Sequence, residues 1–235
     1  MLCLPMADLF DLLAQGRLTE LRDALAIDPA AAWYRNAAGA SLLAQAAYSG
    51  NFEAIALIRA VLPRLDPYES IILGDVESVR TALSDSWDVN APSPDGFSAL
   101  GLAAFFERPE IFDILLPLTR DVNQRANNPQ QVAALHAATA VGDADMVEKL
   151  LRAGADPNLP QADGFLPIHV SAQHGDAVIT GMLILFGASP TAPNAKGKCA
   201  IDHARDGGQD WLAARLASLG GVSTPSRQRD SQLSP

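Results

Sequence analysis

The chain has few cysteines, and they are badly placed for covalent or metal cross-links. Cys3 and Cys199 are far apart and show neither CxxC nor Cys/His spacing. This speaks against a disulfide framework or a zinc site and favours a reducing compartment. No apolar run reaches the roughly 20 residues of a membrane-spanning helix. Residues 1–10 lack the basic and long apolar regions of a signal peptide. We therefore expect a cytoplasmic protein.

Basic and aromatic residues are also scarce. Lysine and arginine number 17 against 27 acidic residues, which gives a net charge of −10. Nucleic acids and anionic membranes attract proteins with excess positive charge, so neither is expected as a partner. An acidic surface is also an ordinary means of staying soluble. Hydrophobic residues make up 49% of the chain but aromatic residues only 6%. Such a core of alanine and leucine suits closely packed helices better than a thick sheet sandwich.

Motifs that carry chemistry are missing as well. The sequence has no Gly-x-Ser-x-Gly elbow and no Gly-x-x-x-x-Gly-Lys-Ser/Thr phosphate loop. Its paired carboxylates, Asp143 with Asp145 and Asp85 with Asp88, fall at expected helix starts and turn edges, where they suit capping. General acid–base catalysis needs a desolvated cleft instead. We expect no catalytic residues, no cofactor and no metal, and hence no enzyme.

Residues 133–172 contain one structural unit and the start of a second. Residues 133–138 (Ala-Ala-Leu-His-Ala-Ala) predict a short helix that ends at Gly142, and residues 143–152 predict another that ends at Gly154. Glycine suits the left-handed position that ends a helix. Asp163-Gly164 predicts a tight, hairpin-like finger. Residues 166–169 (Leu-Pro-Ile-His) then begin the pattern again. One such helix pair cannot bury both helices, so copies are expected on either side.

The position that ends each first helix recurs along the chain. It falls at Gly16, Gly50, Gly74, Glu107, Gly142, Gly175 and Gly208, at intervals of 34, 24, 33, 35, 33 and 33 residues. A period near 33 residues indicates a repeat array. In the one short interval the finger between Val61 and Tyr68 is missing, and Pro63 and Pro67 form a corner. We expect a notch or bend there.

Several motifs resemble ankyrin repeats. They are the period, the His-containing stretches at 133–136 and 166–169, Gly-Ala-Asp at 154–156, and Asp-Val-Asn at 88–90 and 121–123. The family's Thr-Pro-Leu-His start is nowhere complete: residues 166–169 lack the threonine, and residues 98–101 (Ser-Ala-Leu-Gly) lack the histidine. The resemblance implies an all-α solenoid of about seven helix-turn-helix units with short finger loops.

The expected boundaries follow from the period. Residues 1–6 form an N-terminal extension and residues 7–219 the repeat domain. The repeats lie approximately at residues 7–31, 41–62, 66–90, 98–123, 133–158, 166–191 and 199–219. Residues 220–235 contain little to bury and are expected to be a disordered tail.

The histidines have different expected roles. His136 and His169 occupy the motif position, where the resemblance implies a hydrogen bond to the neighbouring finger rather than metal binding or catalysis. His203 has no ligand cluster around it. His174 precedes Gly175 at a position that should face the groove, so a binding role for it stays open.

In ankyrin-like arrays the fingers and the exposed ends of the first helices line a concave face. Transferred by position, the candidate partner-binding residues are Tyr48, Phe97, Phe105, Phe106, Val132, Val141, Phe165, Gln173 and His174. A contiguous patch of apolar side chains on a surface marks an interaction site. The alternative, for Phe97 and Phe165 and also for Phe105 and Phe106, is that some of these rings pack between fingers as part of the core. Phe105 and Phe106 are consecutive, so both cannot enter the same core stripe.

The sequence favours a monomeric, non-enzymatic module that binds a partner protein through the concave groove. A regulatory or inhibitory subunit of a separately encoded enzyme is the alternative. An enzyme in its own right is a distant third. The identity of the partner does not follow from the sequence.

Overall fold

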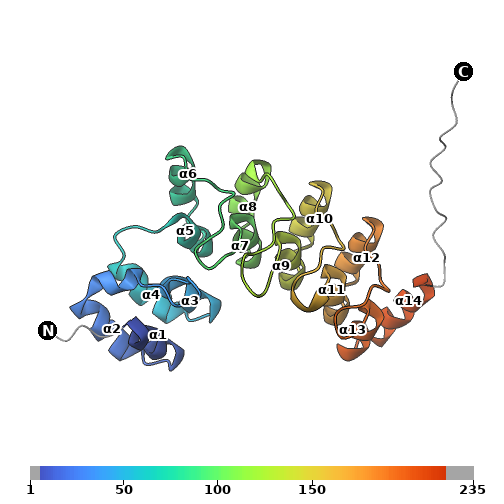
Figure 1. Ribbon diagram of the computed structural model, residues 1–235, viewed down its shortest axis with the longest axis horizontal. Coiled ribbons are helices and arrows are strands. Elements are labelled where there is room, and N and C mark those ends of the chain that lie inside the picture. The colour runs from blue at the N-terminus through green and yellow to red at the C-terminus, as the bar shows by residue number, and fades with distance from the viewer. Residues whose placement is uncertain (1–5, 221–235) are drawn as a thin grey trace, which may run out of the picture.

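The computed structural model describes residues 6–220, which form pairs of antiparallel helices stacked in a row (Figure 1). The predicted all-α solenoid of about seven helix-turn-helix units is confirmed. The expected extension, except for Met6, and the expected tail beyond residue 220 lie outside the described residues. The seven pairs are α1 (Met6–Ala14) with α2 (Leu18–Ile27), α3 (Leu42–Tyr48) with α4 (Phe52–Val61), α5 (Pro67–Leu73) with α6 (Val76–Ser84), α7 (Ala99–Phe105) with α8 (Pro109–Leu115), α9 (Ala134–Val141) with α10 (Ala144–Arg152), α11 (Pro167–His174) with α12 (Ala177–Leu185), and α13 (Ala200–Asp206) with α14 (Asp210–Gly220). Short 3-10 helices lie at Pro29–Trp33, Leu116–Leu118 and Ala162–Gly164.

The ends of the helices follow from single residues. In several pairs the residue before the second helix caps it, because its side chain accepts the backbone N–H of the residue three positions later. Asp143 accepts from Met146 in this way at 2.9 Å. First helices end at left-handed residues such as Gly74 and Gly142, with φ of 78° and 80°. In the fourth pair Glu107 takes this conformation with φ of 54°. A residue with a side chain rarely adopts this conformation. Because Glu107 does so, the position tolerates a residue other than glycine.

Successive fingers are joined by backbone hydrogen bonds. The N–H of Asn127 donates to the carbonyl of Gly96 at 2.7 Å, and that of Ala195 donates to Asp163 at 2.8 Å. The N–H of Ala162 donates to Gln130 at 3.0 Å. Each of these three fingers is therefore hydrogen-bonded to the one before it, and the hydrogen bonds set the distance between them.

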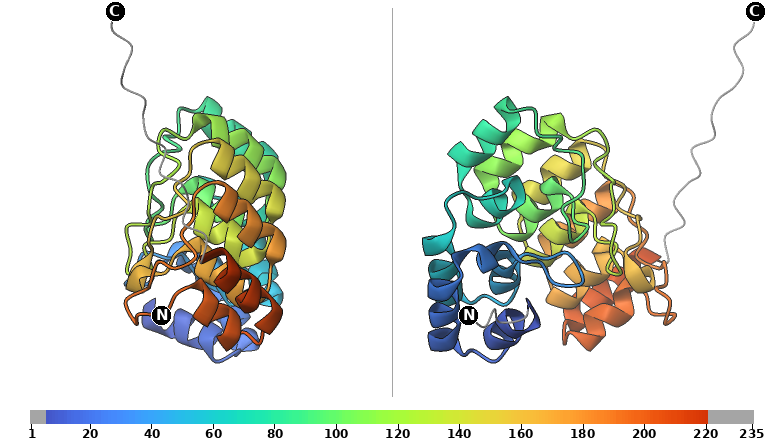
Figure 2. Two further views of the ribbon diagram at one scale, coloured as in Figure 1. Left: turned by 90° about the vertical axis from the view of Figure 1, so that its right-hand side faces the viewer. Right: turned by 60° about the vertical axis from the view of Figure 1, so that its left-hand side comes forward.

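The array bends where the finger is missing. Only residues 62–66 join α4 to α5. The finger at residues 34–41 therefore meets the finger of the fourth pair, because a Cβ on Gly39 would lie 2.1 Å from the carbonyl oxygen of Pro94. These two fingers touch, although the three first helices α3, α5 and α7 lie side by side behind them. The finger side is therefore shorter than the helix side, and the array bends toward its fingers. Figures 1 and 2 show α1–α4 set at an angle to the row that follows.

The bend also divides the apolar interior. One core runs from Leu9 to Leu62 and includes Ile72, and the other begins at Ile71 and continues to Leu216. Neighbouring residues of α5 thus belong to different cores, and Tyr48 and Phe106 pack against both.

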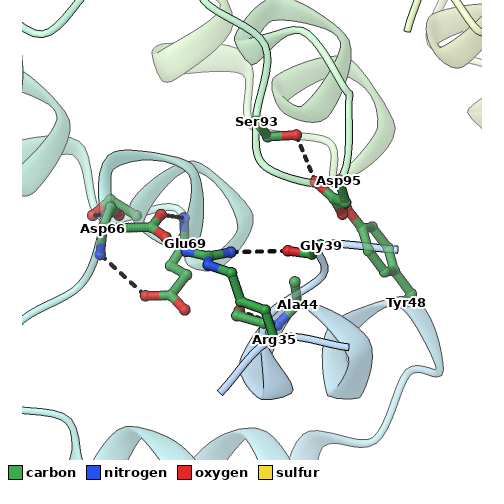
Figure 3. A network of polar contacts seen from close by, with 10 residues as sticks. Arg35, Gly39, Ala44, Tyr48, Asp66, Glu69, Ser93 and Asp95 are labelled. Carbon is green, nitrogen blue, oxygen red and sulfur yellow. Dashed lines mark hydrogen bonds and ion pairs between the residues drawn. The ribbon is translucent and has the colours of Figure 1, made fainter. Parts of the chain in front are cut away.

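Polar side chains hold the junction together (Figure 3). Arg35 pairs with Asp66 at 2.6 Å and donates to the carbonyl of Gly39 at 3.1 Å. Asp66 and Glu69 cap α5 reciprocally, with each side chain accepting the other's backbone N–H. Glu69 is only 2% exposed and its Oε1 has no hydrogen-bond partner. Burial, and next the charge of Asp66, raises the pKa of Glu69. A carboxylate here is therefore costly.

Two histidines fasten first helices to the next finger. His136 Nδ1 accepts the N–H of Ala133 at 3.2 Å, and its Nε2 lies 2.9 Å from the carbonyl oxygen of Leu159. His169 repeats the arrangement with Leu166 and Ala192 at 3.1 and 2.9 Å. The predicted structural role of both histidines is confirmed. Burial lowers the pKa of His136 to about 4 and also lowers that of His169.

Replacing Glu69 with glutamine should stabilise the protein at pH 7. The raised pKa means that the folded state holds this proton more tightly than the unfolded state, so the stability of the parent falls as pH rises through that range. Glutamine resembles the protonated form, and its oxygen can still accept the N–H of Asp66. Thermal unfolding should show a gain at pH 7 that disappears on acidification below about pH 4. Glu77→Gln, in the exposed first turn of α6, is the control. A loss of stability in Glu69→Gln at pH 7 would contradict the interpretation.

His136→Ala should cost on the order of 3 kcal/mol at pH 7, because it leaves the buried N–H of Ala133 and the partly buried carbonyl of Leu159 unpaired. The lowered pKa means that the unfolded state takes up this proton first. The contribution of His136 is thus complete above about pH 6.5 and is lost as pH falls toward 4. Urea unfolding at several pH values should show the two proteins converging on acidification. Exposed His174→Ala should match the parent, whereas a constant gap between parent and His136→Ala would argue against a neutral His136.

Candidate functional site

An apolar pocket of about 310 Å³ opens on the finger side of the array, beside α3, α7 and α9. It takes its walls from first helices and fingers and contains four of the residues predicted from the sequence, Tyr48, Phe97, Phe105 and Val132. The other lining residues are Ser98, Gly101, Leu102, Gln130, His136, Ala137, Ala140, Gln161 and Val170.

A second, more polar depression of about 600 Å³ adjoins this pocket. It shares Tyr48, Phe97 and Gln130 with the pocket, and the two together are called the groove below. Its remaining lining comes from the fingers at 34–41 and 93–97, the following finger, and α3: Asn36, Ala38, Ala40, Gln45, Pro94, Asp95, Asn127, Asn128 and Pro129. The groove therefore has an apolar half and an amide-rich half.

The apolar half exists because the fourth repeat departs from the template. Gly101 stands where His136 and His169 stand in the two following repeats, three residues after the residue that begins the helix. Ser98 caps α7 in another way, because its side chain accepts the backbone N–H of Gly101 at 3.0 Å. The missing imidazole leaves room beside the small residues Ala137 and Ala140. The missing histidine was visible in the sequence, but the space that it leaves was not.

Tyr48 connects the two halves. Its ring lies 5.9 Å from Phe97 and 5.7 Å from Phe106, and its hydroxyl donates to Asp95 Oδ2 at 2.7 Å (Figure 3). Ser93 donates to the other oxygen of Asp95 at 2.5 Å. Burial, and next the negative charge of Asp95, raises the pKa of Tyr48. The phenol therefore stays a neutral donor. Because a finger is missing, Tyr48 of the second repeat reaches the finger of the fourth.

The two consecutive phenylalanines separate as their spacing requires. Phe105 is 46% exposed and lines the pocket, whereas Phe106 is partly buried and packs against both cores. Their rings meet edge to face at 5.1 Å. Only Phe105 is available to a partner in the groove.

The remaining predicted residues lie elsewhere. Phe165 packs against histidines of the first helices α11 and α13, with its ring 6.0 Å from His169 and 5.1 Å from His203. Val141 ends α9, and Gln173 and His174 end α11, outside both halves of the groove. Sequence reasoning missed Asp95, Gln130 and Val170, because their approach to the pocket depends on how neighbouring repeats stack.

Ionisable groups are few at the groove. Neither half contains a lysine or an arginine, and Asp95 is the one carboxylate in its lining. Across residues 6–220, no three His, Cys, Asp or Glu side chains come together in a metal-binding arrangement. Over the same span no helix is both long and apolar enough to cross a membrane.

Comparison with known proteins agrees with this architecture. The family model for the ankyrin repeat matches residues 132–161, which cover α9, α10 and the start of the following finger. No curated protein matches the chain. The match covers one repeat, and the stacked helix pairs, the stacked fingers and the motif histidines between them are consistent with an ankyrin-repeat solenoid.

Proposed function

We propose that the chain is a non-enzymatic module that binds a partner protein through the groove. The observation that carries this proposal is the exposed ring of Phe105 at the mouth of an apolar pocket. Apolar surface exposed to water favours association, since burying a phenylalanine side chain contributes about 1.5–3 kcal/mol. Aromatic anchors in concave pockets carry much of the energy of protein interfaces.

The chemistry of the lining supports binding over catalysis. His136 is buried with both ring nitrogens engaged, and its pKa is lowered to about 4. The hydroxyl of Tyr48 is held by Asp95, and Asp95 is itself held by Ser93. No nucleophile faces a free base in the groove, which is the arrangement that covalent catalysis requires. The proposal includes a monomer in the cytoplasm, a location supported by the wide separation of Cys3 and Cys199 in the sequence.

Phe105→Ser should weaken capture of the partner at least tenfold, with little change in the melting temperature, because the side chain is half exposed. Phe106→Ser should instead lower stability by about 2 kcal/mol, because that ring packs against both cores. Affinity capture from the native host, followed by titration and thermal unfolding, separates the two effects. Phe186→Ser, at 43% exposure in the residue that follows α12, is the matched control. Equal capture by Phe105→Ser and the parent would remove the groove as the binding surface.

Restoring the template in the fourth repeat should stabilise the fold and weaken binding together. In the double variant Ser98→Ala/Gly101→His, an imidazole would occupy a position that lines the pocket. Serine is replaced as well, because a Cβ at residue 101 would lie 2.9 Å from Ser98 Oγ. Removing a glycine from a helix contributes about 0.5–1 kcal/mol.

Thermal unfolding and partner titration would test the double variant. A more stable protein with unchanged affinity would show that the partner does not use the apolar half of the groove.

A further inference from the structure

The groove has an uncompensated negative charge beside its apolar half. Asp95 accepts hydrogen bonds from Tyr48 and Ser93 and forms no ion pair within the described part of the chain. Both donors are neutral, so they orient the carboxylate without cancelling its charge. With no lysine or arginine in either lining, the amide-rich half is electrostatically negative.

The finger edge of the groove also offers unused amides. The side chains of Asn127, Gln130 and Gln161 make no hydrogen bond within residues 6–220. Each presents both a donor and an acceptor, which matches the alternating N–H and C=O groups of an extended backbone. A helix has already satisfied these groups internally and would leave the amides unpaired.

We propose that the groove takes an extended segment of a partner protein, which places a bulky apolar side chain beside Phe105 and a lysine or arginine side chain next to Asp95. This proposal rests on the proposed function and specifies its partner. Tyr48 lines both halves and bonds to Asp95, so the apolar and basic residues should lie within about two to four positions of each other along an extended chain. The net charge of −10 would also steer a basic segment toward this protein.

Two other occupants are possible in principle and can be tested directly. Residues 221–235 of the same chain contain Arg227, Arg229 and Leu233. A second copy of the protein could also occupy the groove. A synthetic peptide of residues 221–235 that binds more tightly than any selected peptide, or dimerisation that Phe105→Ser abolishes, would overturn the assignment to a separate partner.

The test is selection from a library of short random peptides with the full chain as bait. The expected consensus joins a bulky apolar residue to a nearby lysine or arginine. Selected peptides are then made and titrated against the parent, Phe105→Ser, Asp95→Asn and Asp163→Asn. Asp163 is the matched control because it precedes Gly164-Phe165 as Asp95 precedes Gly96-Phe97, yet it lines neither half.

Phe105→Ser should weaken binding at least tenfold. Asp95→Asn should weaken it about three- to tenfold and reduce its dependence on salt, while Asp163→Asn should leave affinity unchanged. Replacing the peptide's basic residue with glutamine should cost the parent the same factor and cost Asp95→Asn nothing further. Asparagine can still accept from Tyr48 through its oxygen, and its amide nitrogen can donate to Ser93 Oγ in place of the bond that Asp95 accepts.

The failures are distinguishable. Peptides that need Phe105 but show no basic residue would overturn the role of Asp95 and leave the proposed function intact. If no peptide is enriched, or if enriched peptides bind Phe105→Ser as well as the parent, the extended segment is overturned. The capture experiment with whole proteins would then decide the proposed function by itself.

Discussion

Hydrogen bonds between the backbones of successive fingers set the geometry of the whole array. The three fingers before α9, α11 and α13 each donate to the one before at 2.7–3.0 Å, which fixes the distance between these neighbouring fingers. When one finger is deleted, the remaining two move together, as the contact of Gly39 with Pro94 shows. The helices of the third repeat still occupy their full width. A turn of the solenoid follows from this mismatch, without any hinge sequence designed for it.

The groove arises from two departures that act at the same place. Deleting the finger brings Tyr48 against Asp95, and replacing the motif histidine with Gly101 opens space on the neighbouring helix. Neither change alone would join an apolar pocket to an amide-rich depression. Repeats that keep the template use the same positions for fasteners, as His136 and His169 do. Equivalent positions thus hold a fastening histidine in some repeats and line the groove in another.

Much of the fold could be predicted from the sequence, because its signals are local. The recurring glycines predict the left-handed ends of first helices, and Asp143 predicts the start of a helix. The motif histidines predict the hydrogen bonds that their own side chains form. The candidate site was predictable only in part. Consecutive numbering shows that Phe105 and Phe106 diverge, but packing decides that Phe106 faces the cores. Tyr48 and Asp95 are 47 residues apart, and only the bend brings them together.

The division of the interior within α5 gives the groove a mechanical role. Repeat arrays are stabilised mainly by contacts between neighbours, and here the apolar interior is divided where Ile71 and Ile72 belong to different cores. Tyr48 forms part of the groove wall from one side of this seam, and α9 forms part of it from the other. A ligand that contacts both Tyr48 and α9 would connect the two sides of this division. Occupancy would then stabilise the folded arrangement of the first two repeats against the rest.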